Sequence, residues 1–153
     1  MLDKTNMWDK RFLELTRHIA GWSKDPSTKC GAVIVGTNQQ VLSTGYNGLP
    51  RGLEYSEKSF ERPYKYYIFE HAERNAIYCA SRHGVPLEGS TMYVTGPPCA
   101  DCARAIVQVG IKIIVYPEKH NFLKRMKSKE WAESIRASRE ILRAGNVIVV
   151  EKP

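Results

Sequence analysis

The chain has 153 residues, of which 42% are hydrophobic and 10% aromatic, and this length and composition predict one globular domain over residues 1–153. No stretch approaches the ~20 consecutive apolar residues that a membrane helix needs, and the polar N-terminus lacks the apolar run of a signal peptide, so we expect a cytoplasmic protein without a membrane partner. The formal net charge of +7 favours anionic partners, a class that includes nucleotides and nucleic acids.

The N-terminal part of the sequence predicts a helix followed by a hairpin. Apolar residues recur at steps of three or four from Asn6 to Ala20, which is the spacing of a helix with one buried stripe. Two short β-prone runs follow, Cys30 to Val35 and Gln40 to Tyr46, with a polar turn between them. The stretch from Asn47 to about Tyr67 has no periodicity, and a loop of this length in a compact domain is often functional.

The C-terminal part alternates between helix-like and strand-like segments. In chain order we predict a helix at Phe69 to Arg82, a strand at Thr91 to Thr95, a helix at Ala100 to Val109, a strand at Ile111 to Tyr116, a helix at about Glu130 to Ala144 and a strand at Asn146 to Val150. Strands joined by helices pair in parallel through right-handed crossovers, because a tight hairpin has no room for a helix. The predicted fold is therefore a three-layer α/β/α arrangement around a mixed five-stranded sheet, with an antiparallel first hairpin and parallel later strands.

Two short motifs carry the predicted chemistry. His71-Ala72-Glu73 opens one predicted helix, and Pro98-Cys99-Ala100-Asp101-Cys102 opens the next. Cysteines three residues apart lie on one face of a helical turn, and a helix N-terminus lowers the pKa of a thiol, so Cys99 and Cys102 suit a metal ion as thiolates. With His71 as a third ligand, the fourth tetrahedral position stays open, as in catalytic zinc sites. We therefore predict one catalytic Zn²⁺ per chain, in the pattern of zinc-dependent nucleobase deaminases.

Glu73 stands too close to His71 in sequence to be an obvious fourth ligand, and its predicted role is proton transfer. It would take a proton from water, protonate the ring nitrogen N3 of cytosine and later deliver a proton to the departing ammonia. The predicted reaction is therefore a hydrolytic deamination.

Other interpretations of the cysteines stay open at this point. A C-x-x-C pair also occurs in thioredoxin-like redox sites, and a purely structural zinc site would need Cys79, Cys30 or His83 to complete it. Cys79 lies eight residues beyond His71, which is about 12 Å along a helix, so Cys79 and Cys30 are predicted to be small core residues. A zinc-stapled interaction domain without catalytic activity is the corresponding non-enzymatic hypothesis.

The chain resembles the cytidine deaminase-like superfamily and, within it, the deoxycytidylate (dCMP) deaminases. The resemblance runs from about Gly21 to Glu118 and, beyond the zinc motifs, rests on the stretch that begins Ser23-Lys24-Asp25-Pro26 and on Gly45-Tyr46-Asn47-Gly48-Leu49-Pro50-Arg51-Gly52. The second stretch is similar to the G-Y-N-G-x-P loop of that family. The resemblance implies a cytidine deaminase-like fold and the conversion of dCMP to dUMP and ammonia in pyrimidine deoxynucleotide metabolism.

The resemblance also implies roles for individual residues. The positions that match the family's zinc ligands are His71, Cys99 and Cys102, and Glu73 matches its proton shuttle. Asn47 matches the asparagine that holds the sugar hydroxyl, for which its amide supplies both a donor and an acceptor. Some members carry a second, structural zinc near the first turn, but the corresponding residues here are Asp25-Pro26, so a single zinc is expected.

Three further residues are predicted substrate contacts. Ser23 and Lys24 match the loop that meets the substrate phosphate, where a hydroxyl and an ammonium are chemically suitable, although a solvated turn is the alternative. His120 stands where the family often has a tyrosine, four residues after the position of Tyr116, and is predicted to contact phosphate or base.

Partners follow from the same resemblance. It implies a homo-oligomer, commonly a hexamer, that dCTP activates and dTTP inhibits, with Asn47 to Gly52 in the sensing region. For the tyrosine-rich stretch that follows this region, the alternative interpretation is a contact between subunits. The basic segment from Lys119 to Lys129 either steers an anionic substrate or forms a solvated face. The alternative function is a polynucleotide deaminase acting on tRNA adenosine or single-strand cytosine. The long loop before His71 argues against it, because such a loop can close over a mononucleotide, so no stable nucleic acid partner is expected.

Overall fold

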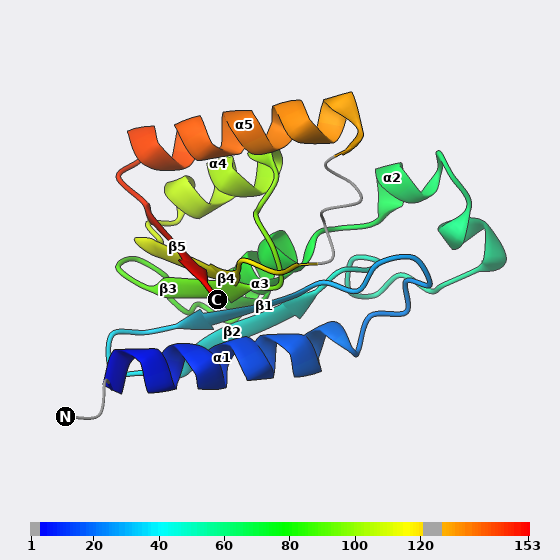
Figure 1. The fold of residues 1–153 in the computed structure, drawn as a ribbon. Helices are drawn as coiled ribbons and strands as arrows, with labels where there is room; N and C mark the ends of the chain where they lie inside the picture. Colours follow the sequence, from blue (N-terminus) through cyan, green and yellow to red (C-terminus); the bar gives the residue numbers. More distant parts are fainter. Residues whose placement is uncertain (1–3, 121–126) are drawn as a thin grey trace.

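The computed structural model describes residues 4–120 and 127–153, so the centre of the basic segment, residues 121–126, lies outside the described residues (Figure 1). Its elements, in chain order, are α1 Lys4–Ala20, β1 Gly31–Val35, β2 Val41–Tyr46, the 3₁₀ helix η1 Glu57–Phe60, α2 Lys65–Ile68, α3 Ala72–Arg82, β3 Thr91–Val94, α4 Ala100–Gln108, β4 Ile113–Pro117, α5 Lys129–Ala144 and β5 Ile148–Lys152. Among the described residues, no helix combines the length and the apolar character that crossing a membrane requires.

The five strands form one mixed sheet in the order β2-β1-β3-β4-β5. β1 is antiparallel to both β2 and β3, whereas β3, β4 and β5 run parallel to one another. The predicted antiparallel hairpin and the predicted parallel strands are both confirmed. The parallel pairs arise where α4 and α5 connect successive strands, because a helical connection returns the chain to the same edge of the sheet.

Helices cover both faces of the sheet, which gives the predicted three layers (Figure 1). On one face, α1 packs Phe12 and Ile19 against Val33 and its neighbours. On the other face lie α3 and α4, and α5 packs mainly against α4. In β4, Ile114 belongs to the α3 and α4 side of the core and Val115 to the α1 side, which explains why this strand is apolar at successive positions.

The aperiodic stretch before His71 contains two short helices, η1 and α2, that sequence periodicity did not predict. They pack around an aromatic cluster in which the ring of Tyr55 stacks on Phe60 and meets Phe69 edge-on. The predicted helix from Phe69 begins later, at Ala72, because Glu70 exchanges two backbone hydrogen bonds with Gly48 and is held extended. Residues after this bridge, starting with His71, are therefore fixed in front of α3.

The contact between β2 and α3 requires glycine at position 45. A Cβ atom there would overlap the carbonyl oxygen of Ala72 and the amide nitrogen of Ala76, and neither backbone atom can rotate away. We predict that Gly45→Ala lowers the free energy of unfolding by about 1–3 kcal/mol or more, which thermal or denaturant unfolding would measure. In Gly36→Ala the added Cβ meets only the flexible side chain of Gln40, so this control should unfold close to the wild type. Equal stability of both variants and wild type would contradict this account of the helix–sheet contact.

Candidate active site

Two helix starts bring three potential metal ligands together. His71 is the N-cap residue of α3 and Cys99 is that of α4, while Cys102 lies in the first turn of α4. The Nδ1 atom of His71 lies 3.4 Å from the Sγ of Cys99 and 3.5 Å from the Sγ of Cys102. Within the described ranges, these residues form the only group of three or more whose ligand atoms all lie within 4.8 Å of one another.

The geometry of this group fits a zinc ion. Tetrahedral zinc with bonds of about 2.3 Å to sulfur and 2.0–2.1 Å to nitrogen separates its ligand atoms by roughly 3.5 Å. The two nitrogen–sulfur distances match this separation, and both cysteines are buried, so their sulfurs need a partner other than water. Nitrogen and two sulfurs are also donors that zinc prefers.

The other two cysteines stay outside this group. Among the described residues, Cys30 and Cys79 form no disulfide, and both are only partly buried, so the prediction that they are core residues is only partly met. The guanidinium group of Arg51 lies 3.6 Å from the Sγ of Cys79. Neither of them, nor His83, belongs to the metal group that the described residues form, and three protein ligands leave a fourth position open.

The two thiols at the site differ in charge. The hydrogen bond with Cys102, followed by that with His71, outweighs burial and lowers the pKa of Cys99 to about 4. The same hydrogen bond raises the pKa of Cys102 well above its ordinary value, with burial acting in the same direction. The two sulfurs therefore share one proton between them, and binding of a zinc ion to both as thiolates must release it.

Arg74 supplies positive charge beside the sulfurs. Its Nη1 lies 3.7 Å from the Sγ of Cys102, and its Nε and Nη2 both lie 2.5 Å from Oε1 of Glu70. Burial lowers the pKa of Arg74, but the negative charge of the sulfur pair, chiefly at Cys102, and the Glu70 carboxylate outweigh burial and raise it, so the guanidinium stays charged. Sequence reasoning missed Arg74, although its position one turn along the helix from His71 was a usable signal.

Glu73 is buried, with 7% of its surface exposed, and lines the pocket beside the metal group without belonging to it. Burial raises the pKa of its carboxyl group, and the charge of Cys99 adds to this while His71 opposes it. A carboxyl group with a raised pKa can both accept and donate a proton closer to neutral pH.

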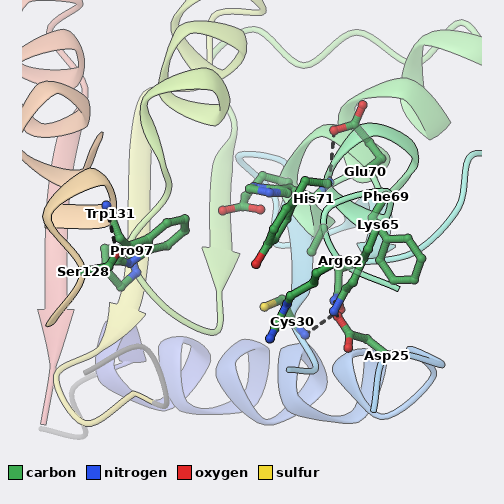
Figure 2. A pocket seen from close by; sticks show the side chains of 14 residues that line it. Asp25, Cys30, Arg62, Lys65, Phe69, Glu70, His71, Pro97, Ser128 and Trp131 are labelled. Atoms are coloured by element: carbon green, nitrogen blue, oxygen red, sulfur yellow. Dashed lines mark hydrogen bonds and ion pairs between the residues drawn. The ribbon is translucent and has the colours of Figure 1, made fainter. Parts of the chain in front are cut away.

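A pocket of about 450 Å³ opens in front of His71 and Glu73. Figure 2 shows Trp131, Pro97 and Ser128 on one side of it, and Phe69 and Lys65 on the other. Pockets of roughly 300–1,000 Å³ with an apolar lining and a few polar groups are typical of small-molecule sites. The opening is therefore large enough for a nucleotide.

Of the predicted substrate contacts, Asn47 lines this pocket, whereas Ser23 and Lys24 do not. The hydroxyl of Ser23 donates its hydrogen to the carbonyl oxygen of Asn47 at 2.7 Å, and the ammonium of Lys24 lies 4.7 Å from the centre of the Tyr55 ring. His120 lines a different cavity, of about 330 Å³, together with Lys29. The predicted phosphate contacts of these three residues stay predictions.

Sequence reasoning also missed several residues of the pocket wall, namely Arg62, Lys65, Phe69 and Trp131. The first three come from the aperiodic stretch and the segment that follows it, where no periodicity indicates which side chains point inward. Trp131 lies at the start of the last predicted helix, where an apolar residue is expected to pack in the core rather than to line a site. The presence of a long loop was the one available signal, and it gave no residue assignments.

The family model for the cytidine and deoxycytidylate deaminase zinc-binding region matches residues 6–118. The protein described as an uncharacterized deaminase in the luxG 3′ region of Aliivibrio fischeri is 41% identical over 147 residues, which cover 95% of this chain and 94% of that protein. Deoxycytidylate deaminase of Mus musculus is 35% identical over 117 residues, which cover 71% of this chain but 64% of that enzyme, less than two thirds of its length.

A solved structure has the same fold. It is the dCMP deaminase of cyanophage S-TIM5 in complex with dCMP and dUMP, which matches with a TM-score of 0.73 at 22% identity, over 99% of this chain and 98% of that chain.

Loss of one sulfur should abolish tight zinc binding. We predict that Cys99→Ala lowers zinc affinity by more than ~100-fold, because even the loss of a partner in the outer shell of a metal site typically costs about 10–100-fold, and that thermal stability falls with it. Metal analysis after dialysis and a melting curve would measure both. Cys79→Ala is the control and should keep its zinc, and a Cys99→Ala protein with wild-type zinc content would rule out the proposed ligand set.

Proposed function

The chain belongs to the cytidine and deoxycytidylate deaminase family, and from this premise we propose that it is a zinc-dependent aminohydrolase that converts dCMP and water to dUMP and ammonia. The observation that carries the proposal is a three-ligand metal group beside a buried carboxyl group, with His71 and Glu73 lining a nucleotide-sized pocket. We assign residues 1–153 to one deaminase domain with one catalytic zinc ion. Its reduced thiolate ligands suit the cytoplasm.

His71, Cys99 and Cys102 would hold the zinc ion. A zinc ion bound there supplies a Lewis acid that makes water nucleophilic at neutral pH. Arg74 balances the charge of the sulfurs, since its guanidinium group lies beside Cys102 and is itself fixed by Glu70. The carboxylate–arginine pair therefore orients a metal ligand from outside the coordination sphere.

Glu73 moves the protons of the reaction. Its carboxylate takes a proton from the attacking water as the new C–O bond forms at C4 of the cytosine ring, and it delivers this proton to N3. Glu73 then takes the remaining proton from the new C4 hydroxyl group and passes it to the exocyclic nitrogen, so that the bond between C4 and this nitrogen breaks, ammonia departs and the C4 carbonyl of uracil forms. The raised pKa of Glu73 supports this double role, because a carboxyl group of ordinary acidity is a poor proton donor at neutral pH.

The pocket walls suggest how the rest of the nucleotide binds. Asn47 contacts the sugar hydroxyl, and the apolar surfaces of Phe69 and Trp131 flank the space for the base. Arg62 is the cation we assign to the substrate phosphate, together with the predicted contacts of Ser23 and Lys24. Its exposed guanidinium lines the pocket and, among the described residues, has the Tyr66 ring as its neighbour and no carboxylate partner.

Regulation by dCTP and dTTP and assembly into a hexamer are further proposals from the family resemblance. Large apolar side chains at the surface of the segment before α3 support a subunit contact there, since Leu53 is 57%, Tyr66 is 66% and Tyr67 is 81% exposed. His120 retains its proposed contact with phosphate or base. Turnover of dCMP with and without dCTP, together with light scattering, tests regulation and assembly.

Substrate class is the direct test of the proposed function. We predict that the zinc-loaded protein releases ammonia from dCMP and does not deaminate adenosine in a tRNA or cytosine in single-stranded DNA. Ammonia release and chromatography of the products would measure this. Turnover of a polynucleotide without turnover of dCMP would favour the alternative function, and absence of all turnover would favour a zinc-stapled interaction domain.

Replacement of Glu73 separates catalysis from metal binding. We predict that Glu73→Gln keeps its zinc but loses at least ~100-fold in kcat for dCMP, because an amide cannot exchange a proton in the way a carboxyl group does. Steady-state kinetics and metal analysis on the same preparation would measure this. Glu133→Gln, on the exposed side of α5, is the matched control and should keep wild-type kcat. An active Glu73→Gln enzyme would contradict the proton-transfer role.

The phosphate assignment has its own test. We predict that Arg62→Gln raises KM for dCMP by roughly 10- to 100-fold, the size of a lost hydrogen bond to a charged group, and leaves kcat/KM for deoxycytidine unchanged because that substrate has no phosphate. Arg82→Gln, at the exposed end of α3, should change neither value. An unchanged KM for dCMP in Arg62→Gln would show that other residues bind the phosphate.

A further inference from the structure

A buried ion pair lies in the pocket wall opposite Trp131 (Figure 2). The Nζ of Lys65 lies 2.6 Å from Oδ2 of Asp25, and these residues are only 6% and 2% exposed. Asp25 follows α1, whereas Lys65 begins α2, so the pair joins two segments far apart in sequence. Burial of both charges carries a large desolvation cost, and such a pair is weak evidence for stability alone.

Through Asp25, the pair helps to fix the orientation of the Asn47 side chain. Its Oδ1 accepts a hydrogen bond from the backbone N–H of Cys30 at 2.8 Å, and its Nδ2 donates to Oδ2 of Asp25 at 3.2 Å and to the carbonyl oxygen of Thr28 at 2.8 Å. Both hydrogens on Nδ2 are therefore donated to acceptors within the protein. One lone pair of Oδ1 remains, so Asn47 can offer the substrate only an acceptor.

Asp25 holds this orientation only while it is a carboxylate. Its Oδ1 accepts from the backbone N–H groups of Ser27 and Thr28, and its Oδ2 accepts from Asn47 and Lys65. Burial by itself raises the pKa of Asp25, but the hydrogen bond and charge of Lys65, with the backbone donors, hold it below its ordinary value. Without Lys65, the buried carboxyl group would tend to take up a proton and could then donate to Oδ1 of a rotated Asn47 amide.

We infer that Lys65 is a positioning residue for sugar recognition, because through Asp25 it fixes Asn47 as an acceptor for the single hydroxyl group of the deoxyribose. This inference rests on the proposed function and adds a specificity to it. A free mononucleotide can donate the hydrogen of its 3′-hydroxyl to Oδ1. A nucleotide inside a polynucleotide cannot, because its 3′-oxygen is esterified, and a 2′,3′-dideoxynucleotide lacks the oxygen altogether. The Lys65–Asp25–Asn47 chain thus selects nucleotides with a free 3′-hydroxyl.

The test compares dCMP with 2′,3′-dideoxycytidine monophosphate. We expect the wild-type enzyme to prefer dCMP in kcat/KM by at least roughly tenfold, because a site built to hydrogen-bond a hydroxyl discriminates against analogues that lack it. In Lys65→Met the preference should fall to about twofold or less, mainly through a higher KM for dCMP, while zinc content stays at the wild-type level. Lys58→Met, an exposed lysine of η1 with its ammonium 4.5 Å from the centre of the Tyr64 ring, is the matched control and should keep the full preference.

A second variant separates positioning from stability. Lys65→Met leaves the buried Asp25 carboxyl group without its ion-pair partner and should lower the melting temperature, whereas the double variant Asp25→Asn with Lys65→Met removes both ionisable groups and should regain part of this loss. The double variant should nevertheless not discriminate between dCMP and the dideoxynucleotide, because the amide group introduced at position 25 directs N–H groups at Asn47. A residue that only stabilised the fold would let discrimination recover together with the melting temperature.

The outcomes distinguish the two proposals. Folded Lys65→Met or double-variant enzyme that retains the wild-type preference for dCMP would overturn the inference, as would a wild-type enzyme that deaminates both nucleotides equally well. A zinc-loaded wild-type enzyme that deaminates neither nucleotide would instead contradict the proposed function itself.

Discussion

The chemistry of this protein depends on two helices whose N-termini lie close together in space. The starts of α3 and α4 lie on one face of the sheet and direct one imidazole nitrogen and two sulfurs at a common point. A helix start favours negative charge, so thiolates are better tolerated there than elsewhere in a buried core. Arg74 adds to this effect from the first turn of α3. If the two helices shifted apart, the metal group would disperse and the adjacent carboxyl group of Glu73 would face no metal-activated water.

The pocket around this group is built by a different part of the chain. The segment between β2 and α3 has little regular structure, and it is held by its aromatic cluster, by the backbone bridge between Gly48 and Glu70 and by the buried pair of Lys65 with Asp25. The same segment contributes cations and aromatic rings to the pocket wall. The proposed metal binding and the proposed substrate recognition are thus divided between two helix starts and an irregular but well-anchored segment.

The division explains what the sequence could predict. Helical and strand periodicity, together with the rule for helical crossovers, was sufficient for the antiparallel hairpin and the parallel later strands, but not for the antiparallel pairing of β1 with β3. The two motifs that contain His71, Cys99 and Cys102 were sufficient for the metal group, because each motif stands at the start of a helix. Arg62 and Lys65 could not be assigned, since their inward orientation depends on contacts between segments that no local pattern encodes. For Ser23 the family resemblance predicts a phosphate contact, which stays a prediction, while the structure shows a hydrogen bond from its hydroxyl to the backbone carbonyl of Asn47 that the sequence did not indicate.

The central claim is that zinc binds to three protein ligands and keeps one position for water, next to Glu73. X-ray absorption at the zinc edge of the substrate-free holoprotein measures this coordination directly. The account predicts one zinc ion per chain with two sulfur ligands, one imidazole nitrogen and one oxygen. A shell completed by a third sulfur or a second imidazole would mean a closed, structural site and would contradict the account.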